Sequence, residues 1–586
     1  MRKKLLSILA LLCLTVTSAW ADVVASGDCG TTGHESEVTW SLDDAGVLTI
    51  SGTGAMTDFG YMETPWYGYR TDITNIVIED GVTTIGNYAF IECENLTTVT
   101  IPNNVTSIGF MAFLGCYSLK TVTIGSGVTS IGKSAFESCN SLTEITVSGE
   151  NLYYKSVDNV LFTKDGTLLK YPEGITATSY TIPNDVKTIG DRAFIFSHLT
   201  EVTIPNSVTT IGDGAFTNCL VTELTIPNSV TTIGEYAFGA CEHLTTLNIG
   251  SGVTSIGNAP CQGCSRLTEI TVSGGNMNFK SVDNVLFNND GKTLVQYPGG
   301  STATSYTIPD GVETISANAF DSSGNLTEVI IPDGVETIGN GAFSNCLGLT
   351  TMNIPSSVTT IDDAFYSCKN LATVTLNSNP YIGLYAFDID GYGTTPAVTM
   401  NLTAKSAGGA QWMTFYSSYG NFQADANTQV FKAELSGTTI TLHEVTDKIV
   451  DAGTAVVLKS TGDPVMTLTT SASSDSQANS LKGVNNPEGE GNDGNFYVLN
   501  YKAATGVGFY KLADGKKLGY GKAYLSYSGS LAPGYFGFGE TTGINAVNGS
   551  EFMINGSDIY NLNGQRVAQP TQKSLYIVNG RKVVIK

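Results

Sequence analysis

The chain has 586 residues, too many for one compact core, since globular domains usually contain about 100–200 residues. Its 65 glycines and a charged fraction of only 14% favour many short strands joined by turns, in several β domains or in a repeat array. The formal net charge of -23 argues against nucleic acid as a partner, because phosphate binding needs clustered lysine and arginine.

The first 21 residues have the three parts of a secretory signal peptide. Arg2–Lys4 form a basic start, Leu5–Val16 an apolar core, and Ala19–Ala21 an A-x-A cleavage site. We therefore expect export and a mature chain that begins at Asp22 and is three charges more acidic. No later apolar stretch reaches the roughly 18–20 residues that a transmembrane helix needs.

A short motif recurs from about residue 76 to residue 387. Its copy at Ile78–Phe90 reads Ile-Glu-Asp-Gly-Val-Thr-Thr-Ile-Gly-Asn-Tyr-Ala-Phe, and the last position recurs every 22 or 23 residues within three runs. This phase comprises Phe90, Phe113, Phe136, Phe194, Phe216, Phe238, Cys261, Phe320, Phe343, Phe365 and Phe387. Each unit also carries Leu-x-x-Val-x-Ile, in which apolar residues alternate as in a half-buried strand. Since no unit can bury its own apolar edge, we predict a mainly β solenoid of stacked coils.

The consensus Leu-x-x-Val-x-Ile-Pro-x-x-Val-x-x-Ile-Gly-x-x-Ala-Phe-x-x-Cys closely resembles the BspA-like class of leucine-rich repeat. The resemblance covers about residues 76–387. It implies a right-handed leucine-rich-repeat solenoid on a secreted or surface protein that binds host or neighbouring-cell proteins. Val38–Trp66 is similar to the N-terminal cap of such proteins. We therefore assign residues 22–75 to a cap and residues 76–422 to the solenoid with its C-terminal cap.

Two inserts, residues 148–182 and 273–308, interrupt the period. Ser156–Phe162 is repeated identically as Ser281–Phe287, which indicates duplication of a block of about 125 residues. Each insert is expected to form a hairpin, with a turn at Asp165-Gly166 in the first and Asp290-Gly291 in the second. The hairpins could brace the solenoid or form part of a binding surface.

Two further segments follow the solenoid. Residues 423–543 are aperiodic and rich in threonine, and they predict a β-sandwich-like domain with loops at Ser471–Ser480 and Asn485–Asn495. Residues 544–586 carry five basic residues against Glu551 and Asp558. This short β segment resembles the C-terminal sorting domains of the type IX secretion route of Bacteroidetes, which implies attachment at the outer-membrane surface. The alternative is a terminal hairpin of the sandwich.

No motif in the sequence predicts catalysis. The four histidines, His34, His198, His243 and His443, have no other histidine or cysteine at metal-ligand spacing. Asp388-x-Asp390-Gly could touch Ca²⁺, but an isolated motif of this kind is usually a turn. We therefore expect a protein that is not an enzyme and has no catalytic, cofactor-binding or metal-binding residues.

Eight cysteines share the phase three residues after the phenylalanine position. They are Cys93, Cys116, Cys139, Cys219, Cys241, Cys264, Cys346 and Cys368. Extracellular cysteines often form disulfides. However, Ser197 and Ser323 occupy the same phase, so the position needs a small residue in a tight turn. Free, buried thiols are therefore expected.

If Val99 and Ile101 point inward, Thr98 and Thr100 lie on an exposed strand face, and the same phases can be followed through every coil. The candidate binding residues on this face are Glu144, Glu201, Glu223, Glu269, Glu328, Thr203, Thr225, Thr246 and Thr271. Threonine alone is explained by an exposed β surface. A column of glutamates is harder to explain that way, because like charges at strand spacing cost stability.

These observations predict a monomeric, adhesin-like protein, secreted or displayed at the outer-membrane surface, that binds a protein partner. One alternative is a structural surface coat or spacer without a specific ligand. A second is a glycan-binding protein that acts through residues 423–543.

Overall fold

The computed structural model describes residues 21–585 with several gaps. The gaps are residues 390–393, 408–409, 437–438, 486–489, 492–495, 503–505, 514–515 and 519, and beyond residue 527 only five short strands are described. Residues 1–20 of the expected signal peptide and Asp390 of the possible calcium motif thus lie outside the described residues. Inside them the chain forms strands, turns and two 3-10 helices, η1 (Glu35–Glu37) and η2 (Tyr67–Tyr69). No helix in these ranges is long and apolar enough to cross a membrane.

Residues 1–244 with 249–261 form one compact unit, and residues 245–248 with 262–586 form a second. Both contain coils of one design. A coil has an A strand, such as β7 (Thr98–Ile101), and after a turn a shorter B strand, such as β8 (Ser107–Ile108). The amide N–H of Phe113 then donates to the Ala135 carbonyl of the next coil at 2.8 Å. Parallel A strands, parallel B strands and this third row of hydrogen bonds join successive coils, so the predicted β-solenoid is confirmed.

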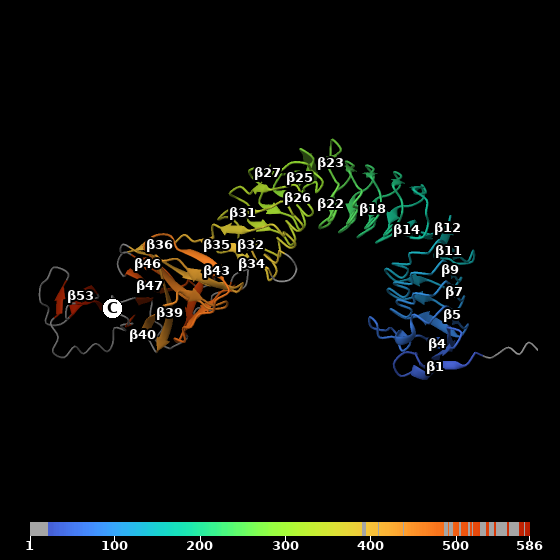
Figure 1. Cartoon of the computed structure of the whole chain (residues 1–586), viewed down its shortest axis with the longest axis horizontal. Helices are drawn as coiled ribbons and strands as arrows, with labels where there is room; N and C mark the ends of the chain where they lie inside the picture. The colour runs from blue at the N-terminus through green and yellow to red at the C-terminus, as the bar shows by residue number, and fades with distance from the viewer. Residues whose placement is uncertain are drawn as a thin grey trace, which may run out of the picture. The chain divides into compact units, whose positions relative to one another are not determined.

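The strands of the first unit follow one another from blue to green in Figure 1. Its A strands are β5 (Asn75–Ile78), β7, β9 (Thr121–Ile124), β11 (Glu144–Val147), β15 (Ser179–Thr181), β17 (Glu201–Thr203) and β19 (Glu223–Thr225). Its B strands are β6 (Val82–Ile85), β8, β10 (Ser130–Ile131), β16 (Thr188–Ile189), β18 (Thr210–Ile211), β20 (Thr232–Ile233) and β22 (Ser255–Ile256). The A strands pair in separate groups, which include β7–β9–β11 and β15–β17, and the first insert lies between these two groups.

The predicted cap, residues 22–75, begins both sheets of the first unit. Its antiparallel strands are β1 (Val23–Asp28), β2 (Val38–Asp43) and β3 (Val47–Gly52), and β3 then pairs in parallel with β5. The short strand β4 (Gly54–Ala55) pairs with β6. The first coil is therefore covered by strands that already have the parallel register of the stack.

Buried aromatic rings form a ladder along the third side of the coils. In the first unit the rings of Phe194 and Phe216 stack with centroids 5.0 Å apart and an interplanar angle of 2°. At the N-terminal end Trp66 stacks on Phe90 at 5.9 Å, and its indole N–H donates to the Ala89 carbonyl at 2.8 Å. Full burial of one phenylalanine contributes about 1.5–3 kcal/mol, so this ladder is a main part of the core.

The first insert is a three-stranded meander rather than a single hairpin. It contains β12 (Tyr154–Val157), β13 (Val160–Thr163) and β14 (Thr167–Lys170). Asp158 and Asn159, both left-handed with φ of 50° and 68°, form the first turn, and the predicted Asp165-Gly166 turn is the second. The hairpin prediction was therefore incomplete.

The last strand of the meander belongs to the stack. β14 pairs in parallel with β16 as an ordinary B strand does, and Tyr171 takes the place of a ladder phenylalanine, 5.5 Å from Phe194. The second insert repeats this arrangement with β24 (Phe279–Val282), β25 (Val285–Asn288) and β26 (Thr293–Gln296), followed by Tyr297 at 5.1 Å from Phe320. Each insert thus completes an elongated coil.

Charged side chains are buried where the first insert enters the stack. Lys170 Nζ lies 2.5 Å from Glu173 Oε1, and these side chains are 9% and 1% exposed. Glu173 Oε1 also accepts the amide N–H of Ser138 at 3.0 Å, whereas the equivalent amide of Gly115 donates to the Glu137 backbone carbonyl of the next coil. Burial raises the pKa of Glu173, although Lys170 acts in the opposite direction. The carboxylate therefore replaces a backbone acceptor that the insert removes.

A second pair at this position changes between the two blocks. In the first block Arg192 Nη1 donates to both oxygens of the Glu137 carboxylate at 2.6 and 2.8 Å. In the second block Gln262 and Asn318 hold the same two places, and Gln262 Nε2 donates to Asn318 Oδ1 at 3.3 Å. Both partners have changed together, so an ion pair in one block corresponds to a neutral hydrogen bond in the other.

In the second block a different residue accepts the hydrogen bond of the equivalent backbone amide. The N–H of Gly263, the counterpart of Ser138, donates to Asp321 Oδ2 at 2.6 Å. Asp321 is 1% exposed and also accepts hydrogen bonds from Ser322 and Asn345. The two inserts therefore meet one backbone requirement with carboxylates from different sequence positions.

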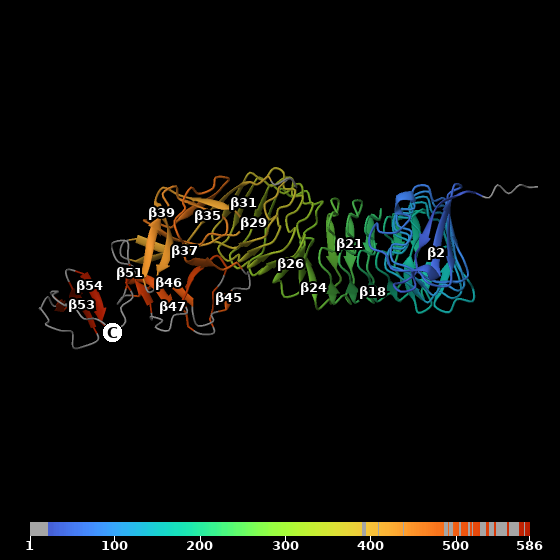
Figure 2. The same ribbon diagram turned by 90° about the horizontal axis from the view of Figure 1, so that it is seen from below.

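The coils of the second unit continue with the same two kinds of strand. Its A strands are β21 (Thr246–Ile249), of which residues 246–248 belong to this unit, β23 (Glu269–Val272), β27 (Ser305–Thr307), β29 (Glu328–Ile330), β31 (Thr351–Ile354), β33 (Thr373–Leu376) and β35 (Ala397–Asn401). Besides β26, its B strands are β28 (Thr314–Ile315), β30 (Thr337–Ile338), β32 (Thr360–Ile361) and β34 (Tyr381–Ile382). Figure 2 labels β29, β31 and β35 of this series.

The solenoid passes directly into the C-terminal sheets, so the predicted boundary between residues 422 and 423 is not a structural one. β35 pairs in parallel with β33 on one side and antiparallel with β43 (Val465–Thr469) on the other. β43 in turn pairs with β38 (Asn421–Ala424), which spans the boundary and also pairs with β41 (Ile449–Val450). An unpaired edge after β35 would expose backbone groups, and the antiparallel strand covers it.

Two further sheets complete a layered β module. One contains β36 (Lys405–Ala407), β37 (Ala410–Phe415), β42 (Val456–Ser460), β39 (Thr428–Ser436), β40 (Thr439–Glu444) and β51 (Ile544–Asn545). The other contains β44 (Leu481–Gly483), β49 (Ala523–Ser526), β46 (Phe496–Lys502), β47 (Gly506–Lys511) and β50 (Tyr535–Gly537), beside the short pair β45 (Glu490–Gly491) and β48 (Lys517–Leu518). Val456 and Leu458 of β42 join the solenoid core, whereas Val457 faces Tyr497 and Leu525 in a second core. The predicted β-sandwich-like module is present and shares its first layer with the solenoid.

The segment 544–586 divides into two parts. β51 pairs antiparallel with β40 and so belongs to the sandwich. β52 (Ile559–Asn561), β53 (Ser574–Val578) and β54 (Arg581–Ile585) form a separate three-stranded antiparallel sheet. The predicted terminal hairpin is thus β53–β54, and in the described residues it pairs with β52 rather than with a strand of the sandwich.

Candidate binding surface

The A strands present one exposed face along the coils of each unit. In β7 the first and third residues are exposed and the second and fourth are buried, and β17 and β19 show the same alternation. The pattern follows from the two-residue period of a strand that has a core on one side. The inward and outward phases predicted for this face are therefore correct.

Most of the candidate binding residues lie on this face in contact with solvent. The exposed members are Glu144, Glu201, Glu223, Glu269, Glu328, Thr203 and Thr225. Thr246 and Thr271 are half-buried, and the Thr271 hydroxyl donates to Asn248 Oδ1 at 2.7 Å. Thr271 is therefore less available to a partner than the sequence pattern indicates.

The glutamates share one phase but do not form one continuous row. In the first unit Glu144 pairs with Thr121 of the preceding coil, and Glu201 pairs with Ser179. In the second unit Glu328 pairs with Ser305. Among the five glutamates, Glu201 and Glu223 occupy consecutive coils of the first unit. Hydroxyl neighbours therefore separate most of these charges, which reduces the repulsion between like charges on adjacent strands.

The exposed face of the first unit is hollowed beside its first coils. A depression of about 530 Å³ lies across β5, β7 and β9. Its lining includes Val77, Thr98, Thr100 and Thr123 from the strands, and Ser148 from the start of the first insert. Val77 is 41% exposed, so the hollow offers apolar as well as hydroxyl contacts.

Many other threonines are needed by the stack itself. The hydroxyl of Thr200 donates to the Thr178 carbonyl of the preceding coil at 3.1 Å, and Thr327 donates to Thr304 at 3.0 Å. A second row beside the B strands repeats this bond, for example from Thr231 to the Thr209 carbonyl at 3.1 Å. The high threonine content is therefore partly structural, which sequence alone could not separate from a binding role.

A second acidic row, which the sequence analysis missed, also serves the stack. Asp191 Oδ1 accepts the amide N–H of Asp213 at 2.9 Å, and Asp213 Oδ1 accepts that of Glu235 at 2.9 Å. Lys133 Nζ lies 2.8 Å from Asp191 Oδ2. The sequence signal was an Asp or Glu directly after Ile-Gly in successive coils. These carboxylates cap backbone amides, so they are poor candidates for ligand binding.

The cysteines are also part of the coil structure. All ten in the described residues are free and buried, as expected for eight of them from their shared phase. Cys116 Sγ–H donates to the Phe90 carbonyl at 3.2 Å, and burial raises the pKa of Cys93 to about 12. Such thiols are protonated and unreactive at neutral pH. At the serine-substituted positions, Ser197 Oγ contacts Cys219 Sγ at 3.0 Å, whereas Ser323 Oγ is buried without a partner.

Replacing Cys116 by serine should cost about 1–2 kcal/mol and leave the fold intact. The shorter hydroxyl reaches the Phe90 carbonyl less well than the thiol, and an imperfectly bonded buried hydroxyl is unfavourable. Urea denaturation would measure the free energy of unfolding, with the far-ultraviolet spectrum as the control for fold. Loss of the folded state, or mass spectrometry that shows this thiol in a disulfide in the parent protein, would contradict the interpretation.

The described residues contain no group of three or more His, Cys, Asp and Glu side chains arranged to hold a metal ion. His443 Nε2 lies 3.0 Å from Glu434 Oε2, and His198 Nδ1 lies 3.1 Å from the Glu173 carbonyl. His34 pairs with Glu37 at the surface. None of these contacts joins a histidine to a nucleophilic side chain, so no described histidine contact resembles a catalytic triad.

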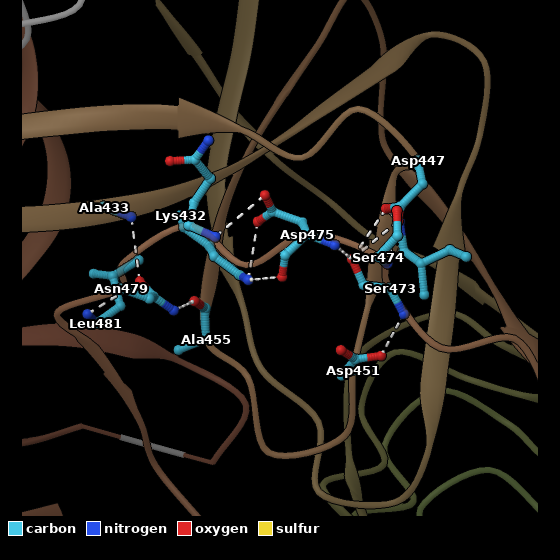
Figure 3. A network of polar contacts seen from close by, with 12 residues as sticks. Lys432, Ala433, Asp447, Asp451, Ala455, Ser473, Ser474, Asp475, Asn479 and Leu481 are labelled. Carbon is cyan, nitrogen blue, oxygen red and sulfur yellow. Dashed lines mark hydrogen bonds and ion pairs between the residues drawn. The ribbon is translucent and has the colours of Figure 1, made fainter.

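The predicted sandwich loop Ser471–Ser480 is held by a polar network (Figure 3). Lys432 Nζ lies 2.9 Å from Asp475 Oδ2, and both side chains are nearly buried. Asp447 accepts the amide N–H of Ser474 at 2.6 Å, and Asn479 Oδ1 accepts that of Ala433. Burial alone would raise the pKa of Asp447. The amide donors from Ile449 and Ser474 and the hydroxyls of Ser473 and Ser474 lower this pKa overall. The polar groups of this loop are therefore occupied in fixing its own position.

The described residues of the sandwich include no large apolar side chain that is strongly exposed. Among the side chains that the structure describes, the strongly exposed large apolar ones all precede residue 386. Sugar rings are commonly bound by stacking on exposed aromatic faces, as bases are. The described part of residues 423–543 thus gives no specific support to the glycan-binding alternative.

Comparison with known proteins identifies the repeat. The family model "BspA type Leucine rich repeat region" matches six copies over residues 66–168, 171–293 and 299–391, together more than half of the chain. No curated protein matches the chain.

Three similar solved structures are leucine-rich-repeat proteins. A leucine-rich repeat protein from Eubacterium ventriosum is 29% identical, with a TM-score of 0.37 over 57% of this chain and 92% of that one. A leucine rich cell surface protein from Faecalibacterium prausnitzii is 26% identical, with a TM-score of 0.34 over 59% and 88%. A leucine-rich repeat protein from Bacteroides ovatus is 24% identical, with a TM-score of 0.28 over 60% and 90%. From the family match and the three-sided coils described above, the chain belongs to the BspA-type leucine-rich-repeat family.

Proposed function

We propose that this protein is exported to the cell surface or secreted, where it binds a protein partner through the exposed face of its A strands. The observation that carries the proposal is this face itself, which combines exposed glutamates, exposed threonines and a hollow of about 530 Å³ in a solenoid that leaves its largest regular surface open. The signal-peptide-like start supports export. The resemblance of residues 544–586 to sorting domains supports attachment at the outer membrane.

The charge of the face indicates the kind of partner. A chain of net charge -23 with exposed glutamates on its open face favours a protein that carries a basic patch. Such contacts act strongly on the association rate, and they weaken with salt because the screening length is about 8 Å at physiological ionic strength.

Reversing three of these charges should weaken binding. The immobilised mature chain would first retain a partner from extracellular host or neighbouring-cell proteins, and the purified partner would then be titrated calorimetrically. Replacement of Glu201, Glu223 and Glu269 by lysine should raise the Kd at least tenfold at 50 mM salt and much less at 500 mM. The melting temperature should not fall, since all three side chains are exposed.

A matched control makes the same change of charge elsewhere. Glu242, Asp310 and Asp333 are exposed but lie outside the phases of the strand face. Their replacement by lysine should have less effect than the strand-face variant. Equal binding by the strand-face variant and the parent would exclude this face as the site, and failure to retain any protein would favour the coat or spacer alternative.

A further inference from the structure

The loop before the first strand of each insert exposes a large apolar side chain. Leu152 is 76% exposed and its counterpart Met277 is 78% exposed. Among the described residues one other large apolar side chain is as accessible, Leu384 at 75%. Single exposed apolar residues are common, but here the two that are most exposed occupy the same position in both blocks.

The backbone that carries Leu152 is held firmly. The Asn151 side chain is fully buried, and its amide N–H groups donate to the carbonyls of Gly125 and Val128 at 2.9 and 3.0 Å. Its Oδ1 accepts the amide N–H groups of Tyr153 and Tyr154, both at 2.8 Å. The buried asparagine therefore fixes the chain immediately before and after Leu152.

The second insert holds Met277 by the same means. Asn276 is 8% exposed, and its Oδ1 accepts the amide N–H groups of Asn278 and Phe279, both at 2.8 Å. A backbone that is already fixed loses no further conformational freedom when its side chain binds, so each loop is prepared for contact with a partner.

The two loops differ around this position. Glu150 in the first block corresponds to Gly275 in the second, and Tyr153 corresponds to Asn278. The apolar residue has changed from leucine to methionine but has stayed large, although it lies in water and adds nothing to the core. Folding needs the buried asparagine at this turn and does not need an exposed apolar side chain beside it.

We propose that residues 149–153 and 274–278, the insert loops, are apolar anchors that enter hydrophobic pockets on a protein partner. The inference deepens the proposed function and rests on it. Ser148, immediately before the first loop, also lines the hollow of the strand face, so anchor and face form adjoining surfaces. Exposed Glu144 begins the strand before the first loop, and exposed Glu150 lies within that loop. Glu269 begins the strand before the second loop. The pocket on the partner is therefore expected to be bordered by lysine or arginine.

A protein is favoured over a lipid surface by charge. Biological membranes that attract peripheral proteins are mostly anionic, and they would repel a chain of net charge -23 whose first loop carries a glutamate. A few side chains that are fully desolvated in pockets carry most of the binding energy of a protein interface, so two such anchors can contribute a large share of it.

The test uses the full mature chain and the partner purified as described above. A photo-crosslinking amino acid at position 152 or 277 should cross-link to that partner, whereas the same group at position 384 should not. The double variant Leu152→Ser with Met277→Ser should raise the Kd at least tenfold at both 50 and 500 mM salt, since an apolar contact is not screened. Leu384→Ser is the matched control and should leave the Kd unchanged.

The outcomes separate this inference from the proposed function. If charge reversal on the strand face weakens binding but the double serine variant does not, the face binds and the anchors are wrong. If the double serine variant loses more than about 2 °C in melting temperature, the variant Leu152→Met with Met277→Leu is measured instead. Its Kd is expected to equal that of the parent, because both side chains stay large and apolar. Retention by phosphatidylcholine–phosphatidylglycerol vesicles that the serines abolish, or self-association that they abolish, would also overturn the assignment to a protein partner.

Discussion

Lys170→Ala is expected to destabilise the first unit by about 3–5 kcal/mol at pH 7, because it leaves the carboxylate of Glu173 buried without its cation. The Lys170 Nζ–Glu173 Oε1 distance of 2.5 Å and the 1% exposure of Glu173 leave water little access to that charge. Urea denaturation of the mature chain, followed by tryptophan fluorescence, would measure the loss. A loss below about 1 kcal/mol would contradict this account of the buried Lys170–Glu173 pair.

The size of this loss should depend on pH. Burial already raises the pKa of Glu173 above its ordinary value, so the folded state holds this proton more tightly than the unfolded state does. Stability that depends on such a group is greatest below the unfolded pKa and falls as the pH rises toward the folded pKa. Without Lys170 the folded pKa should rise further. The variant should therefore lose less stability at pH 4 than at pH 7.

Two variants serve as controls for the charge. Gln296 occupies the position of Lys170 in the second block, and Gln296→Ala should cost about 1–3 kcal/mol through its lost hydrogen bonds, with no such pH dependence. Lys170→Met combined with Glu173→Gln should recover most of the stability, since the new amide oxygen can still accept the Ser138 N–H. If the combined variant is as unstable as Lys170→Ala, lost packing rather than an unpaired charge explains the effect.

Phe216→Ala should cost about 3–5 kcal/mol, the usual range for removing a fully buried phenylalanine. Its ring lies between those of Phe194 and Phe238, at 5.0 and 6.0 Å, so the cavity would interrupt the ladder within a run of coils. Because each coil contacts only its neighbours, the loss should be concentrated locally and could split unfolding into two transitions. Hydrogen exchange of coils on both sides of the change would locate it.

Phe196→Ala is the matched control for Phe216. It removes the same kind of side chain from the preceding coil, but that ring is 40% exposed and not part of the stacked core. The expected loss is below about 1 kcal/mol. Equal losses from the two variants would show that the aromatic ladder does not determine the stability of the coils.

The coil architecture could be predicted from the sequence because a single period repeats in every unit. Val99 and Ile101 define the inward phase, and a strand period of two then places every neighbour. The extra rung of each insert was missed because Tyr171 and Tyr297 replace phenylalanine at an altered spacing. The Tyr-Pro dipeptide shared by both inserts was the available signal.

The buried charges and the true end of the solenoid depend on contacts between distant residues. Glu137 and Arg192 are 55 positions apart, and their separate sequence contexts predict two surface residues. Their joint replacement by Gln262 and Asn318 in the second block was the visible sign that they touch. The sequence pattern identified which residues of the strand face are exposed. It could not show whether a threonine hydroxyl bonds to the preceding coil or faces a partner, because that depends on the positions of backbone atoms.

The antiparallel strand β43 beside β35 also limits growth of the A-strand sheet. A parallel stack that ended in an open strand would act as a template for the first coil of another molecule, and copies could add end to end into fibres. Here the strand beside the last A strand runs antiparallel, so the parallel register of the A-strand sheet is not offered to another molecule at this end.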